Sequence, residues 1–368
     1  MDNALRSAPP VPFDPRFEHL EFDEAETARE LVETLRGIME TTAKDYGHAV
    51  RSVHAKSHGI LRGELKVFDV LPPELAQGIF AMAATYPVVM RFSTNPGDIL
   101  DDSISLPRGL AVKIVGVPGE RLPDSPGADQ DFVMVNGPAF SASTAKAFLA
   151  NLKLLAKTTD TPQILKKAVS AALRGAETLV EAVGGKSGTL IALGGHPNTH
   201  VLGDTFYTQA PMLYGPYVAK ISVAPVSANL QALTGAKVDV SGKPNALREA
   251  VADVFATQGG EWELRVQLMT DPHTMPIEDA SVPWSEEESP YIAVGRITVA
   301  PQDAWSPAAE RHVDQGMAFS PWHGVLAHRP LGSIMRVRKP AYEMSSGFRS
   351  RHNGCPIMQP TSAEDIGI

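Results

Sequence analysis

The sequence predicts an α+β fold: a closed barrel of about eight strands, interrupted by helical insertions and followed by C-terminal helices. Three observations lead to this expectation. Eight short β-rich runs are bounded by Gly, Pro, Asp and Asn, as strands usually are. Eight strands also suffice to close a barrel around packed side chains or one ligand. Helical segments interrupt the runs irregularly, which disfavours a doubly wound parallel sheet and leaves an open sheet with flanking helices as the alternative.

The N-terminal part of the chain is expected to be an extended arm that leads into a helix. Four of the first 16 residues are prolines, so the arm is assigned to residues 1–22. Residues 23–45 place apolar side chains at helical spacing among acidic ones, which predicts a surface helix. Helical periodicity returns at 142–185, at about 244–257 and across 303–351.

The eight expected strands lie between these helical segments. They cover residues 49–56, 60–68, 88–94, 108–116, 131–136, 216–224, 261–270 and 291–299. No break in composition divides the chain, so residues 23–368 are expected to form one domain. Its barrel core would span about 49–300, and its helical C-terminal segment about 303–352.

Composition excludes several classes of protein. The 368 residues include 33 Lys and Arg against 42 Asp and Glu, and the net charge of -9 argues against a nucleic-acid binder. The single cysteine, Cys355, allows no internal disulfide framework and no thiolate metal cluster. The N-terminal residues are too polar for a secretory signal, and the longest uncharged run, 187–203, is broken by Gly, His, Pro and Asn. A cytoplasmic protein without a membrane span is expected.

Three of the expected strands contain polar residues that could take part in catalysis. His54 lies in the first strand, Arg91 and Ser93 lie in the third, and Asn136 ends the fifth. Taken singly, each has an ordinary structural explanation. The histidine could be packed in the core, the arginine could be a screened surface charge, and the asparagine could turn the chain.

The C-terminal helical segment contains a fourth candidate group. On a helix, Arg338, Tyr342 and Arg349 would share one face, because side chains one and two turns apart lie above one another. A basic, solvated helix with one aromatic anchor is the alternative. Pro340 would either start this helix or kink it, so whether Arg338 reaches Tyr342 depends on where the helix begins.

Five motifs along the chain together resemble the monofunctional haem catalase superfamily. They are R-x-V-H-A-K at 51–56, R-F-S-T at 91–94, P-R-G-L-A-V-K at 107–113, V-N-x-P at 135–138, and R-x-x-x-Y at 338–342 with a further arginine at 349. The motifs occur in the family's order. The chain is short, and its helical insertion at 142–185 is more similar to the minimal catalase-related peroxidases. The resemblance implies a catalase-like antiparallel eight-stranded barrel.

The resemblance also implies a haem b cofactor and a role for each candidate residue. His54 would move a proton between the two peroxide oxygens, Asn136 would orient the peroxide, and Ser93 would fix the imidazole. Tyr342 would be the axial ligand of the haem iron, with Arg338 beside its phenol. The other residues implied to contact the haem are Arg51, Val53, Arg91, Phe140 and Arg349. The arginines would pair with its propionates.

The expected function is heterolytic cleavage of hydrogen peroxide or an organic hydroperoxide through an oxoferryl intermediate. Peroxidase activity with a small organic electron donor, and weaker catalase activity, would follow. Two alternatives stay open: an allene-oxide-synthase-like rearrangement of fatty-acid hydroperoxides, and non-catalytic binding of haem or another apolar ligand. Val53, which precedes His54, matches the peroxide-dismutating relatives and disfavours the rearrangement. Such relatives are usually oligomers, so a homo-oligomer is expected.

Overall fold

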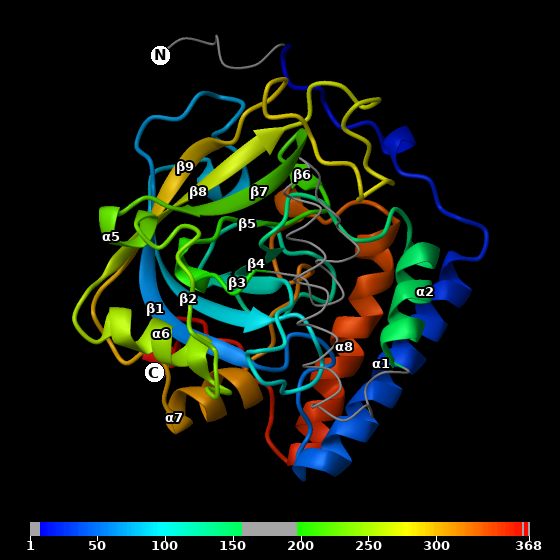
Figure 1. The fold of residues 1–368 in the computed structure, drawn as a ribbon. Coiled ribbons are helices and arrows are strands. Elements are labelled where there is room, and N and C mark those ends of the chain that lie inside the picture. Colours follow the sequence, from blue (N-terminus) through cyan, green and yellow to red (C-terminus); the bar gives the residue numbers. More distant parts are fainter. Residues whose placement is uncertain (1–7, 157–196, 363, 367–368) are drawn as a thin grey trace, which may run out of the picture.

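The computed structural model describes residues 8–156, 197–362 and 364–366. Within them, nine strands form one antiparallel sheet that curls into a barrel (Figure 1). The strands are β1 Ser57–Val67, β2 Thr85–Thr94, β3 Arg108–Ile114, β4 Gln130–Val135, β5 Phe206–Tyr207, β6 Met212–Tyr214, β7 Tyr217–Pro225, β8 Gly260–Leu268 and β9 Ile292–Val299.

Eight of the described strands close the barrel. Each strand from β1 to β4 pairs with the next, and β1 pairs with β9 on its other side, followed by β8 and β7. The short strand β5 joins the two ends, because it pairs with β4 at Tyr207 and with β7 at Phe206 and Tyr207. The ninth strand, β6, lies along the same edge of β7 nearer its start. The predicted eight-stranded barrel is therefore confirmed.

Side-chain alternation sorts the strand residues into an apolar interior and a functional exterior. Phe92, Leu110 and Met134, on three neighbouring strands, belong to the main buried cluster that fills the barrel. Successive strand residues point to opposite faces, so the residues between them point outward. On β2, this outward set includes Arg91 and Ser93, which are nevertheless buried because helices cover that part of the wall.

Three helices cover the outer wall at β2–β4: α1 Glu24–Tyr46, α2 Ala145–Ala156 and α8 Ser333–Asn353. Figure 1 shows them side by side along one flank of the barrel. Leu31 and Leu35 of α1 pack against Leu149 of α2 and Val337 of α8 in a separate apolar cluster. The spacing of Leu31 and Leu35 is that of one helix face, so the predicted surface helix at 23–45 is confirmed.

The remaining described helices are short. The α-helices are α5 Ala228–Gln231, α6 Ala246–Phe255 and α7 Pro307–Ala309, and α7 continues directly into a π-helix, Glu310–Gln315. Single 3₁₀ turns occur at Pro15–Phe17, Gly78–Phe80, Val201–Gly203, Leu326–His328 and Glu364–Ile366. The helix α6 matches the one predicted at 244–257. The described part of the chain contains no helix long and apolar enough to cross a membrane.

Two sequence-based expectations need correction. Residues 49–56 are not a strand: His54 has a φ of 54°, outside the range of extended backbone, and its amide bonds to the carbonyl of Asn95 in the loop after β2. The eighth barrel strand is instead β5, whose two residues are too few to give a pattern. The segment 303–351 is only partly helical, since 316–332 contains only one 3₁₀ turn. Of the expected helix 142–185, the part beyond Ala156 lies outside the described residues.

Candidate active site

A cavity of about 1100 Å³ lies between the outer wall of β2–β4 and the three covering helices. Its lining includes all ten candidate residues of the sequence analysis. They are Arg51, Val53, His54, Arg91, Ser93, Asn136, Phe140, Arg338, Tyr342 and Arg349. The chain brings them together from four separate regions: the loop before β1, strand β2, the turn after β4, and α8.

The part of the barrel wall that borders the cavity contains several small residues. Its paired rows across β2, β3 and β4 are Ser93–Gly109–Val135 and Arg91–Ala111–Val133. Ala111 and Val133 leave a shallow apolar surface beside the longer polar side chains. A flat apolar group could lie against this surface.

His54 projects from the loop before β1 onto this wall. Its Nδ1 lies 3.1 Å from Ser93 Oγ, which also contacts the carbonyl of Gly109 at 3.5 Å. A Cβ atom on Gly109 would lie 2.4 Å from Cε1 of the imidazole, so only glycine leaves room for the ring. Burial, together with the positive charges of Arg91 and Arg338, lowers the pKa of His54 to about 3. The imidazole is therefore neutral near pH 7 and can accept a proton.

The opposite side of the cavity is one face of α8. Arg338, Ala341, Tyr342, Ser345 and Arg349 all line the cavity, as their helical spacing predicts. Arg338 donates a hydrogen bond from Nη2 to Tyr342 Oη at 2.7 Å, so the guanidinium group lies directly beside the phenol oxygen. The helix begins at Ser333 rather than at Pro340, so the proline lies in its interior and Arg338 still reaches Tyr342.

Three arginines of the cavity lining, Arg51, Arg91 and Arg349, lie around the partly buried Asp314 of the π-helix. Arg91 forms an ion pair with Asp314, and Arg51 Nε lies 4.0 Å from the same carboxylate. Arg349 donates to the backbone carbonyl of Asp314 at 2.6 Å. Burial alone would raise the pKa of Asp314, but Arg91 and Arg51 outweigh it and keep that pKa low. One carboxylate thus faces three guanidinium groups.

Asn136 sits at the end of β4, with its amide held by the protein. Its Oδ1 accepts a hydrogen bond from the amide of Arg108 at 2.9 Å, and its Nδ2 donates to Asp204 at 2.8 Å. Both Asn136 and Asp204 line the cavity. The asparagine therefore has the chain-turning role that its position suggests, and it also borders the candidate site.

Val53 and Phe140 belong to the apolar part of the lining. Val53 packs against the cluster of α1, α2 and α8. The ring of Phe140 meets that of Phe148 edge to face at 5.1 Å, and Arg338 lies 5.9 Å from the Phe140 ring centre. Plain packing and contact with a ligand are both compatible with these positions.

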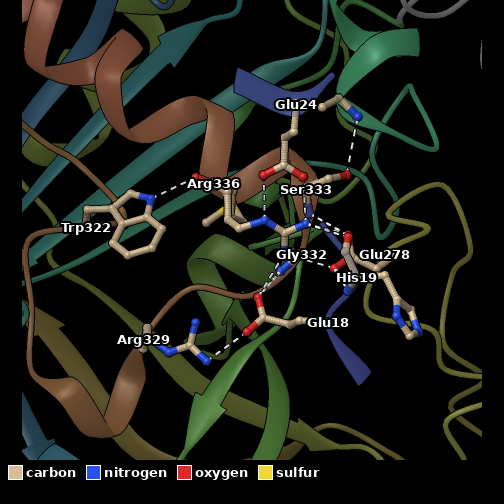
Figure 2. A network of polar contacts seen from close by, with 11 residues as sticks. Glu18, His19, Glu24, Glu278, Trp322, Arg329, Gly332, Ser333 and Arg336 are labelled. Atoms are coloured by element: carbon tan, nitrogen blue, oxygen red, sulfur yellow. Dashed lines mark hydrogen bonds and ion pairs between the residues drawn. The ribbon is translucent and has the colours of Figure 1, made fainter. Parts of the chain in front are cut away.

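An ion-pair network around Arg336 fixes the first turns of α8 (Figure 2). The Arg336 guanidinium bonds to Glu24 at 2.7 Å, to Glu278 at 2.9 Å and to Glu18 at 3.0 Å. Glu18 belongs to the N-terminal arm, Glu24 starts α1, and Glu278 follows β8. These contacts tie α8 to three segments that are distant from it in sequence. Arg338 of the cavity lies two residues after Arg336 on the same helix.

A second charged cluster lies beside the cavity, on the outer side of β3 and β4. Asp129, Asp131 and His323 have ligand atoms close enough to share a metal ion. Lys113, however, bonds to both aspartates, at 2.7 Å to Asp131, and its ammonium group already supplies the cation. This cluster is an internal ion-pair group in the structure.

Sequence reasoning missed four residues of this region. Asp314 and Asp204 carry no motif signal, because each is a lone aspartate in a segment whose fold was mispredicted or unassigned. Gln209 was missed for the same reason. Gly109 lies within the P-R-G-L-A-V-K motif, and asking why a strand should contain glycine could have revealed its contact with His54.

Comparison with known proteins identifies the fold. No protein-family model matches the sequence, and no curated protein matches it significantly. Solved structures do match. A fungal catalase aligns with a TM-score of 0.58 and 16% identity over 87% of this chain. Catalase A from Saccharomyces cerevisiae gives 0.57 and 16% over 93%, and a bacterial catalase gives 0.54 and 15% over 94%.

The chain has the catalase fold. It covers 65%, 68% and 64% of the lengths of those three catalases, so it corresponds to about two thirds of each. At this level of identity, the likeness concerns the barrel and its helices.

Proposed function

We propose that this protein is a haem-dependent enzyme that cleaves hydrogen peroxide or an organic hydroperoxide, with peroxidase activity and weaker catalase activity. One observation carries the proposal. One cavity holds a neutral imidazole, His54, on the barrel side and an arginine-bound phenol, Tyr342, on the helix side. An acid–base group and an axial iron ligand are two protein parts used in peroxide cleavage at haem, and tyrosine is the axial ligand in catalase.

The residues present fit a haem group. Buried Nε atoms of Arg51 and Arg349 have no hydrogen-bond partner among the described residues. With Arg91, they give three guanidinium groups against the one carboxylate of Asp314, so two further carboxylates would balance the charge. The shallow wall at Ala111 and Val133 offers an apolar surface for a flat ring. Tyr342 would hold the iron, and the three arginines would hold the propionates.

When bound, haem iron would supply the redox centre at which the peroxide O–O bond breaks. The protein would transfer the proton of the peroxide. Since Nδ1 of His54 is engaged by Ser93, Nε2 is the atom that takes a proton from one peroxide oxygen and returns it to the other. Asn136 would donate a hydrogen bond to the peroxide. Arg338 would stabilise the phenolate of Tyr342 and keep it oriented toward the iron.

The size of the cavity supports an organic reductant. Dismutation of hydrogen peroxide favours a narrow site, whereas about 1100 Å³ at the upper end of small-molecule pockets can hold a cofactor and part of a second organic molecule. The apolar walls from Phe140 and Phe148 suit the same kind of molecule. This supports peroxidase turnover over dismutation.

The test is turnover by the haem-loaded protein, with oxygen release and oxidation of an organic donor measured in parallel. We expect donor oxidation to exceed oxygen release. His54→Ala should lower the rate of peroxide consumption by at least about 10²-fold, the usual scale for general acid–base catalysis. A near wild-type rate in His54→Ala would remove the histidine from the mechanism, and absence of any peroxide consumption by the haem-loaded wild type would refute the proposed function.

A further inference from the structure

We infer that residues 279–285 form a cover at the edge of the cavity, which opens when Lys220 beneath it is protonated and closes when that amine is neutral. Lys220 lies on β7, and only 1% of the residue is exposed. The cover belongs to the irregular chain between β8 and β9. Its movement would control access to the cavity whatever reaction the cavity carries out.

Lys220 contacts the cover through its amine. Its Nζ donates a hydrogen bond to the carbonyl of Val282 at 3.2 Å and lies 4.8 Å from the centre of the Trp284 ring. No ion pair joins Lys220 to a carboxylate in the described part of the chain. One carbonyl and one aromatic face compensate only part of the cost of burying a charge.

Two other lysines that are buried in the described chain have the partner that Lys220 lacks. The Nζ of Lys56 lies 2.7 Å from Asp102, and the Nζ of Lys113 lies 2.7 Å from Asp131. Such pairing is what makes a buried charge tolerable, and a buried charge without it is costly. A protonated Lys220 therefore destabilises the closed cover, whereas a neutral amine does not.

The surroundings of Lys220 set the pH range of this effect. Burial lowers the pKa of Lys220 to about 7, and the carboxylate of Asp279, the one charged group of the described chain that acts on it, opposes burial without outweighing it. Its neighbour on β8 is the neutral Gln267. With the cover open, Lys220 would meet water, where the pKa of a lysine is roughly 10.4. Between about pH 7 and roughly pH 10.4 only the open form holds the proton, so raising the pH through this range closes the cover.

The cover borders the cavity directly. Ser281 lines the cavity and is exposed to solvent. The carbonyl of Ala280 accepts a hydrogen bond from the amide of Phe140 at 2.9 Å, and the amide of Ala280 donates to the carbonyl of Ser143 at 3.2 Å. Opening would break both bonds and release the chain at Phe140, which also lines the cavity. The cavity would therefore be more accessible near neutral pH than at alkaline pH.

The test is hydrogen exchange of the purified full chain, followed by mass spectrometry at about pH 7.5 and about pH 9.5, with each rate divided by the intrinsic rate at that pH. Protection of the amides in 279–285 should increase at least about tenfold from the lower pH to the higher, because the open form loses its advantage in proton binding. The helix α6 is the internal reference, and its protection should change less than about threefold.

Lys220→Met keeps an unbranched side chain and removes the charge. Protection of 279–285 in this variant should vary less than about threefold between the two pH values. The matched control is Lys66→Met, at an exposed lysine of β1 whose ion pair with Asp69 is 3.8 Å long, and it should keep the wild-type pH dependence.

Equal protection of 279–285 at both pH values in the wild type would overturn the inference, even if Lys220→Met does not fold. An equal increase in α6 would also overturn it, because the pH would then act on the whole chain. A folded Lys220→Met variant that keeps the wild-type pH dependence would do the same.

Discussion

The position of the His54 imidazole depends on Gly109, the residue of the barrel wall against which the ring lies. In Gly109→Ala, the new Cβ would lie 2.4 Å from Cε1 and 2.5 Å from Nδ1, so the ring must leave its contact with Ser93. We expect peroxide consumption to fall at least about tenfold while haem remains bound, because the change displaces the acid–base group and not the cofactor's ligands.

The matched control for this variant is Gly37→Ala in α1, where a Cβ meets no atom within 4 Å and alanine favours the helix. It should leave the rate of peroxide consumption unchanged. A wild-type rate in Gly109→Ala would show that the imidazole position seen here is not the one used in catalysis.

The pH dependence of the enzyme follows from the buried environment of His54. A histidine with its usual pKa near 6.5 would lose roughly thirtyfold of its neutral form by about pH 5. With a pKa of about 3, His54 stays neutral, so the rate should vary less than about twofold between about pH 8 and pH 5. A rate that declines with an apparent pKa near 6.5 would contradict this environment.

The same shift has a consequence for stability. The folded chain does not bind the His54 proton between about pH 3 and 6.5, whereas the unfolded chain does. The contribution of this residue to the free energy of unfolding is therefore fully present above about pH 6.5 and decreases as the pH falls below it.

At the scale of elements, the position of Arg338 and Tyr342 depends on how α8 is held. Arg336 anchors its first turns through Glu18, Glu24 and Glu278 (Figure 2). Arg336→Gln would leave three partly buried glutamates without their shared cation, and we expect a loss of about 2–3 kcal/mol in the free energy of unfolding. Chemical denaturation of the purified protein measures it.

Arg265→Gln is the control for this variant, since its ion pair with Glu263 is more exposed and joins two residues of one strand. It should change the free energy of unfolding by less than about 1 kcal/mol. If Arg336→Gln is as stable as this control, the network does not position α8.

The elements also show what sequence can and cannot predict. The helix at 23–45 and most strands were predicted because their apolar residues repeat at a regular spacing. The prediction of a strand at 49–56 was wrong, because His54 has a positive φ and its amide bonds to a loop carbonyl rather than to a strand. Strand β5 has only two residues, which are too few to show a periodic pattern in the sequence. Its role in closing the barrel depends on strands that are distant in sequence.

For the site, local motifs sufficed to name the residues that line the cavity, but not their partners. Arg91 could be chosen from its motif, whereas its counter-charge Asp314 lies 223 residues away in a π-helix without a sequence signature. Asp204 and Gln209 likewise become candidates only when the fold brings them to the turn after β4. Long-range contacts of this kind follow from the closed barrel and not from any local pattern.

At the scale of the whole molecule, the barrel and its covering helices border the cavity, and the central claim is that this cavity holds haem through Tyr342. The most direct measurement is the absorption spectrum of the purified protein, expressed with a haem precursor, for the wild type, Tyr342→Phe and Tyr207→Phe. Tyr207 packs against Tyr291 and is not among the residues that line the cavity, so its variant is the matched control.

We predict a ferric, high-spin haem spectrum with phenolate character in the wild type and in Tyr207→Phe. In Tyr342→Phe, haem should be lost or its spin state should change, because the axial ligand is gone. The same spectrum in all three proteins, or no haem in the wild type, would contradict the account.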